Sequence, residues 1–160
     1  HELKDFVKET VIDTDFELLF PDDYVNNITE RLNLYNKLGD LKTEEELQKY
    51  ETDLIDRFGK LPIQAIDLLN SVRIKWIAIA IGLERVIMKQ GKLVGYFVTD
   101  QESSFYQSPI FSKIIQFVKI NPSLVKMKEK NTRNGLRLII TFENITTINK
   151  ALQSLSPILV

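Results

Sequence analysis

Residues 54–62, Leu-Ile-Asp-Arg-Phe-Gly-Lys-Leu-Pro, constrain the fold more than any other stretch of this chain, because they end one helix and begin another. Gly59 ends the helix before it, since glycine adopts at little cost the left-handed conformation that ends many helices. Pro62 begins the helix after it, where its missing N–H has no helical partner to lose. The segment also carries Asp56 and Arg57, which have no place in an apolar core.

Three helices are predicted in the first half, at residues 22–38, 43–58 and 63–81, after a strand at residues 10–20 that Pro21 ends. Asp22 or Asp23 is expected to cap the first helix, and Gly39 to follow its last turn. Thr43 and Glu46 form a capping box at the start of the second helix. The first apolar stripe is expected to comprise Val25, Ile28, Leu32, Tyr35 and Leu38, and the second Leu47, Leu54 and Phe58.

The spacing of apolar residues changes from helical to strand-like after Gly82, where two hairpins are predicted. Gln90-Gly91 joins one pair of apolar runs, and residues 131–135 join the other. Pro109 is expected to open a helix, and Asn144 to cap a last one. The expected fold class is α+β: a three-helix N-terminal half packed with a small, mostly antiparallel sheet and helices in the C-terminal half.

We expect residues 1–21 to form a strand and lead-in, residues 22–83 the helical half and residues 84–160 the α+β half. The last two ranges are expected to form one compact domain.

Composition narrows the function classes. The chain is 44% hydrophobic and 27% charged with a net charge of −1, which is typical of a globular protein without overall bias toward polyanions. It has no cysteine, and its single histidine is His1, so thiolate or histidine metal sites and imidazole catalysis are not expected. We expect a cytoplasmic piece of a longer protein, without a membrane segment, because the longest apolar run, residues 76–81, is far shorter than the roughly 20 residues that span a bilayer.

Charge is concentrated in two segments. Residues 40–56 contain seven acidic and two basic side chains, and residues 113–137 contain seven basic and one acidic. On the acidic helix, Asp53, Asp56 and Arg57 are predicted to share one sector that points away from the core. Asp53 and Arg57 are four residues apart and can pair within the helix, which leaves Asp56 free to meet an arginine on another surface.

The sequence gives little support to a catalytic function. The chain has no G-x-x-x-x-G-K-[ST] phosphate loop, and its serines have no nearby histidine base. Asp22 and Asp23 fit a helix start better than a metal or acid–base pair, because adjacent residues diverge on a helix. We therefore expect no catalytic residue, cofactor or metal in this chain, and no ATP binding or hydrolysis.

Four pieces, in this order and spacing, carry a resemblance: Pro21-Asp22-Asp23-Tyr24, Arg31-Leu-Asn-Leu-Tyr-Asn-Lys37, Lys42-Thr-Glu-Glu-Glu-Leu47, and residues 54–62. Over residues 15–82 they resemble the C-terminal domain of bacterial transcription-repair coupling factors, the Mfd family. Residues 84–160 carry no motif that matches closely.

The resemblance implies a non-catalytic regulatory domain of an ATP-dependent DNA translocase that removes stalled RNA polymerase and recruits nucleotide excision repair. In that family the domain packs against an excinuclease-B-like N-terminal module of the same chain, masks the surface that binds the excinuclease A subunit, and autoinhibits the motor. The positions that carry over to the partner interface are Asp53, Asp56 and Arg57. The first of these is often Glu in the family, so Asp53 has a shorter reach.

An alternative function remains open. The basic 113–137 segment would suit an accessory domain that contacts nucleic acid, although no known nucleic-acid-binding motif accompanies it. Salt dependence separates the two readings, since counterion release makes DNA affinity fall steeply with salt.

Overall fold

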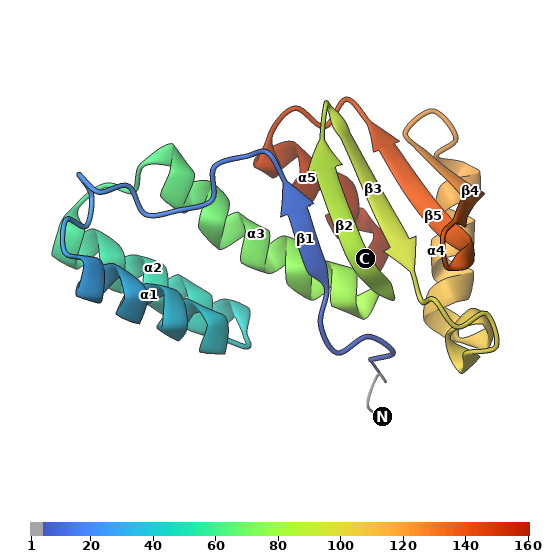
Figure 1. Ribbon diagram of the computed structural model, residues 1–160, viewed down its shortest axis with the longest axis horizontal. Coiled ribbons are helices and arrows are strands. Elements are labelled where there is room, and N and C mark those ends of the chain that lie inside the picture. The colour runs from blue at the N-terminus through green and yellow to red at the C-terminus, as the bar shows by residue number, and fades with distance from the viewer. Residues whose placement is uncertain (1–4) are drawn as a thin grey trace. The chain divides into compact units, whose positions relative to one another are not determined.

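A computed structural model describes residues 5–160, so the sequence expectation for His1 lies outside the described residues. The fold is α+β, as predicted (Figure 1). The chain divides into two compact units, each described by itself below. A helical unit comprises Glu17–Arg73, and an α/β unit comprises the chain up to Phe16 together with Ile74–Val160. The division falls inside a helix, rather than at the change of period near Gly82.

The α/β unit is built on one five-stranded sheet. Its strands are β1 (Val11–Thr14), β2 (Leu83–Lys89), β3 (Lys92–Phe97), β4 (Val125–Thr132) and β5 (Gly135–Glu143), in the spatial order β1-β2-β3-β5-β4. β1 runs parallel to β2 and every other pair is antiparallel, which confirms a mostly antiparallel sheet. The predicted strand at residues 10–20 is real but ends at Thr14.

Both predicted hairpins are present. Gln90 and Gly91 have φ of 54° and 75°, the left-handed pair that matches the twist of a two-residue hairpin turn. The β4–β5 strands extend further than expected, so that their turn contains only Arg133 and Asn134 and is followed by Gly135 at φ 109°.

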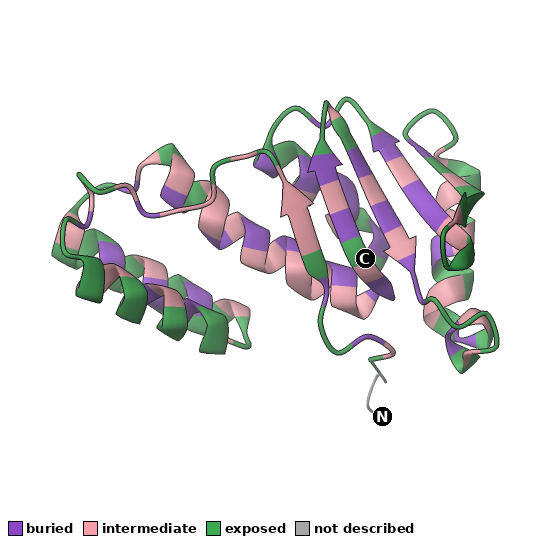
Figure 2. Cartoon of the chain, in the orientation of Figure 1, coloured by how far each residue is buried: buried purple, intermediate pink, exposed green. Residues whose placement is uncertain are grey.

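Helices cover one face of this sheet (Figure 1): the end of α3 (Ile63–Ala80), α4 (Pro109–Ile120) and α5 (Ile148–Leu155). Short 3₁₀ helices, Ser104–Gln107 and Ser156–Leu159, follow β3 and α5. The covered face is apolar, because strand residues that share it are all fully buried: Val86, Met88, Leu93, Ile140 and Phe142 (Figure 2). Gly82, at φ 81°, lies against the ring of Phe105, where a Cβ would come within 2.3 Å of a ring carbon.

Two caps in this unit differ in outcome. Pro109 opens α4 as expected, with Ser108 as its N-cap. The prediction that Asn144 caps the last helix was wrong: Thr147 is the N-cap, accepting from the Lys150 N–H at 3.0 Å. Asn144 instead takes a positive φ of 59° in the connection, a conformation that asparagine tolerates better than most residues.

The helical unit contains α1 (Ile28–Asp40), α2 (Glu44–Phe58) and the first part of α3. The capping box at Thr43 and Glu46 is confirmed, and Gly59 ends α2 at φ 90°. The guanidinium of Arg73 donates to both carboxylate oxygens of Glu44, at 2.8 and 2.7 Å, and so ties α3 to the start of α2. This hydrogen-bonded guanidinium lowers the pKa of Glu44.

The start of α1 was predicted wrongly. Pro21–Tyr24 is a turn, closed by the Tyr24 N–H on the Pro21 carbonyl at 3.0 Å, and Asp22 and Asp23 do not cap the helix. The N-cap is Asn27, whose side chain accepts from the Glu30 N–H at 2.9 Å.

The far end of α1 and its apolar stripe also differ from expectation. Gly39 lies inside the helix and not beyond it. The buried side of the helix is set by Leu34 and Leu38, while Ile28 and Leu32 are 66% and 57% exposed. Within residues 5–160, no helix has the length and apolar character needed to cross a membrane.

Candidate functional site

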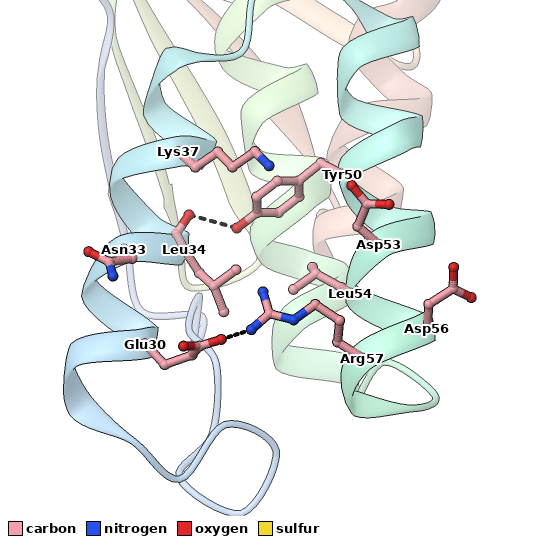
Figure 3. Close-up of a pocket in the computed structure, with 9 residues that line it drawn as sticks. All are labelled: Glu30, Asn33, Leu34, Lys37, Tyr50, Asp53, Leu54, Asp56 and Arg57. Carbon is pink, nitrogen blue, oxygen red and sulfur yellow. Dashed lines mark hydrogen bonds and ion pairs between the residues drawn. The ribbon is translucent and has the colours of Figure 1, made fainter.

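The three predicted interface residues line one groove on the helical unit, between α1 and α2 (Figure 3). The groove has a volume of about 340 Å³. One face of each helix supplies its lining, at helical spacing: Glu30, Asn33, Leu34 and Lys37 from α1, and Tyr50, Asp53, Leu54, Asp56 and Arg57 from α2. The site is therefore a product of the α1–α2 packing.

Buried side chains form the base of the groove and fix its shape. Leu34, Tyr50 and Leu54 are only 7%, 3% and 1% exposed. The Tyr50 hydroxyl donates a 2.7 Å hydrogen bond to the Leu34 carbonyl oxygen, so a side chain of α2 is anchored to the backbone of α1. Burial raises the pKa of Tyr50, which keeps the phenol protonated and able to donate. The base is thus rigid, and the charged groups lie above it.

Arg57 does not pair within its own helix as the sequence predicted. Its guanidinium forms an ion pair with Glu30 across the groove, and Figure 3 shows the side chain reaching toward α1. The guanidinium carbon also lies 4.7 Å from the centre of the Phe58 ring. An arginine on an aromatic face and opposite a carboxylate is better held than one in an exposed pair along a single helix. The within-helix partner, Asp53, is left without it.

The two aspartates of α2, together with Lys37 of α1, are the open charges of the groove. Asp53 and Asp56 are exposed, as predicted. Among residues 5–160, neither side chain has a hydrogen bond or ion pair. They do not share one narrow sector with Arg57, however: in Figure 3 Asp56 points away from α1, whereas Arg57 points toward it. The groove therefore offers two separate carboxylates on its α2 side.

Glu30 is the residue that sequence reasoning missed. It follows the Asn27 cap in the first turn of α1, where an acidic residue is ordinary helix chemistry. Residues four apart share one face of a helix, so Glu30 lies on the same side of α1 as the buried Leu34. Its pairing with Arg57 depends on how α1 packs on α2, which no local pattern contains.

Other candidates are separate from this groove. The basic 113–137 segment is divided between α4, β4 and β5 of the α/β unit. Asp22 forms an ion pair with Arg31 at 3.3 Å. Over the part of the chain that the structure describes, no cluster of three or more His, Cys, Asp or Glu side chains is arranged to hold a metal ion.

Comparison with known proteins gives a consistent set of relatives. The family model described as TRCF domain matches residues 14–108. A transcription-repair-coupling factor from Rickettsia prowazekii is 28% identical over 144 residues, which cover 90% of this chain and 12% of that protein. The transcription-repair-coupling factor of Escherichia coli K12 is 34% identical over 79 residues, 49% of this chain and 7% of that protein.

A solved structure, the C-terminal domain of a transcription-repair coupling factor, superposes with a TM-score of 0.69 at 16% sequence identity. The match covers 94% of this chain and 93% of the solved one, so the fold of the whole chain is shared. The chain spans about an eighth of the length of the Rickettsia relative, and so corresponds to one part of a much longer protein.

Proposed function

The chain belongs to the TRCF domain family of transcription-repair coupling factors, and we propose that it acts as a non-catalytic clamp on another module of the same protein. The proposed partner is an excinuclease-B-like N-terminal module. Its capture by this domain masks the surface that binds the excinuclease A subunit and holds the DNA translocase in check. In this proposal RNA polymerase, the excinuclease A subunit and DNA are partners of the longer protein.

The observation that carries this proposal is the α1–α2 groove. Exposed carboxylates cost little to leave in water, yet two of them sit without a partner beside a rigid, partly apolar base. Such a surface suits a cationic side chain with an aliphatic stem, above all an arginine, which binds a carboxylate through two parallel hydrogen bonds. Asp53 and Asp56 are the proposed acceptors.

Arg57 has a different role in this proposal from the two aspartates. Because Glu30 already neutralises it, Arg57 chiefly links α2 to α1 across the groove. A carboxylate of the partner can reach it only in competition with Glu30. We therefore assign Asp53 and Asp56 the larger share of binding free energy, and Arg57 the smaller.

The direct test is a titration of this chain into the separately purified N-terminal module of the same protein, followed by calorimetry. We expect saturable binding that weakens as salt rises, since the proposed contacts are ionic. The N-terminal module alone should capture the excinuclease A subunit. With this chain bound to the module, that capture should fall. Absence of any binding at low salt would refute the clamp.

A further inference from the structure

The uncovered face of the sheet in the α/β unit carries a row of lysines that the clamp does not use. Strand pairing places Lys126 opposite Thr141, Lys128 opposite Ile139 and Lys130 opposite Arg137. Directly opposed residues of an antiparallel pair point to the same face. The neighbouring positions of β4, Val125 and Met127, point to the helix-covered side.

These three lysines are exposed, and their spacing is regular. Alternate residues of a strand lie about 6.6–6.8 Å apart, so β4 presents three positive charges in a straight line. None of the three has an ion pair with another residue of the described chain. Lys130 is instead placed by Tyr96: its Nζ lies 3.0 Å from the phenol oxygen and 5.6 Å from the ring centre.

The rest of this face is neutral or already paired. Asp13 is occupied by Arg85 and Lys89, at 3.0 and 3.1 Å, and their hydrogen bonds lower the pKa of its carboxyl group. Glu84 binds Arg137 at 3.2 Å. Asp13 balances only one of its two cations, so most but not all of the unbalanced charge on this face lies along β4.

Half-buried side chains, with the buried Ile139 among them, adjoin the lysine row on the same face. Val94 and Tyr96 of β3 lie opposite Thr141 and Ile139 of β5, which themselves lie opposite the β4 lysines. The guanidinium carbon of Arg137 lies 5.4 Å from the centre of the Tyr96 ring, and the Arg137 side chain is 15% exposed. A cationic row beside a strip that holds the Tyr96 ring offers both contacts that an unpaired strand needs: charge for its phosphates and a planar group for its bases.

We propose that this face, defined by Lys126, Lys128, Lys130 and the Tyr96–Arg137 strip, binds single-stranded nucleic acid without sequence preference. The phosphates follow β4 and the bases lie over β3 and β5. A duplex, whose bases are stacked inside, would use only the lysines. An acidic peptide would also meet the lysines, but it has no bases to place on the strip.

The test measures binding of a fluorescent oligothymidylate of about 16 nucleotides to the full chain by anisotropy over a range of salt. The variant is the triple substitution Lys126→Gln, Lys128→Gln, Lys130→Gln. The control is Lys42→Gln, Lys49→Gln, Lys60→Gln, which removes the same charge from exposed positions of the helical unit. Circular dichroism establishes that each variant is folded.

Wild type and control should show the same slope of log affinity against log salt. The magnitude of that slope should fall by about 2 in the β4 variant, because each of the three lost phosphate contacts contributes about 0.7. A duplex of equal length and poly-glutamate should both bind less tightly. The proposal is overturned by absence of binding at low salt, by equal losses in the two triple variants, or by duplex or poly-glutamate binding as tight as the oligothymidylate. If the β4 variant unfolds, the comparison is repeated with Lys128→Gln alone. A change near zero in the salt slope of that variant refutes the proposal.

Discussion

Replacing Asp56 by alanine or arginine should separate binding from folding in the helical unit. The side chain is exposed and makes no contact with a partner in the described chain, so the free energy of unfolding should change by no more than about 0.5 kcal/mol. At the proposed interface, removing one member of a desolvated charge pair costs about 2–5 kcal/mol. Affinity for the N-terminal module should therefore fall by roughly 30-fold or more while the melting temperature stays nearly constant.

Leu54 supplies the opposite case, two residues earlier in the same helix. It is 1% exposed at the base of the groove, so Leu54→Ala should cost about 2–5 kcal/mol of unfolding free energy. For a chain of this size that corresponds to a fall in melting temperature of about 4–20 °C. Phe58→Ala should also destabilise the fold, by less, because Phe58 is only partly buried.

The assay pairs thermal melting with calorimetric binding for each variant, and Asp40→Ala serves as a control that removes one exposed carboxylate outside the groove. If the Asp56 variants melt as early as Leu54→Ala, Asp56 is structural and the clamp loses its main residue. If they melt normally and bind as well as Asp40→Ala, the interface lies elsewhere on the domain. In the full-length protein, a true interface variant should also increase binding of the excinuclease A subunit.

Three further predictions concern stability and are checked by urea unfolding. Thr43→Ala should lose about 0.5–2 kcal/mol because it breaks the reciprocal capping box; a loss below about 0.3 kcal/mol would contradict that role. Gly82→Ala should cost at least about 2 kcal/mol more than Gly135→Ala, since both have positive φ but only the first would collide with a buried ring; equal losses would show that the ring moves aside. Hydrogen bonds from Arg73 lower the folded-state pKa of Glu44, so this pair stabilises the fold fully above the unfolded pKa near 4.5 and less as pH falls through the folded-state pKa. Glu44→Gln should be less stable than wild type at pH 7, and the difference should shrink as pH falls below 4.5. A difference independent of pH would be inconsistent with the ion pair.

The elements that could be predicted are those that local chemistry determines. The Thr43 capping box, the Gly59 stop and the Gln90-Gly91 turn each depend on a few adjacent residues, and all three are present. The errors lie where two residues compete for one local role. Asp22 and Asp23 resemble a helix start, but the chain makes a turn there and Asn27 caps instead; Thr147 likewise replaces Asn144.

The groove shows why a site of this kind is only partly readable from sequence. Exposure of Asp53, Asp56 and Arg57 follows from the position of the buried stripe on α2, and could be predicted. Their partners could not, because the distance from Glu30 to Arg57 depends on how α1 docks, and that docking rests on nonlocal contacts such as the Tyr50 hydrogen bond to the Leu34 carbonyl. The consequence is chemical: with Arg57 taken by Glu30, the unpaired charges left for a partner are Asp53 and Asp56 on α2 and Lys37 on α1. We therefore expect a partner that binds the α2 side of this groove to bring positive charge.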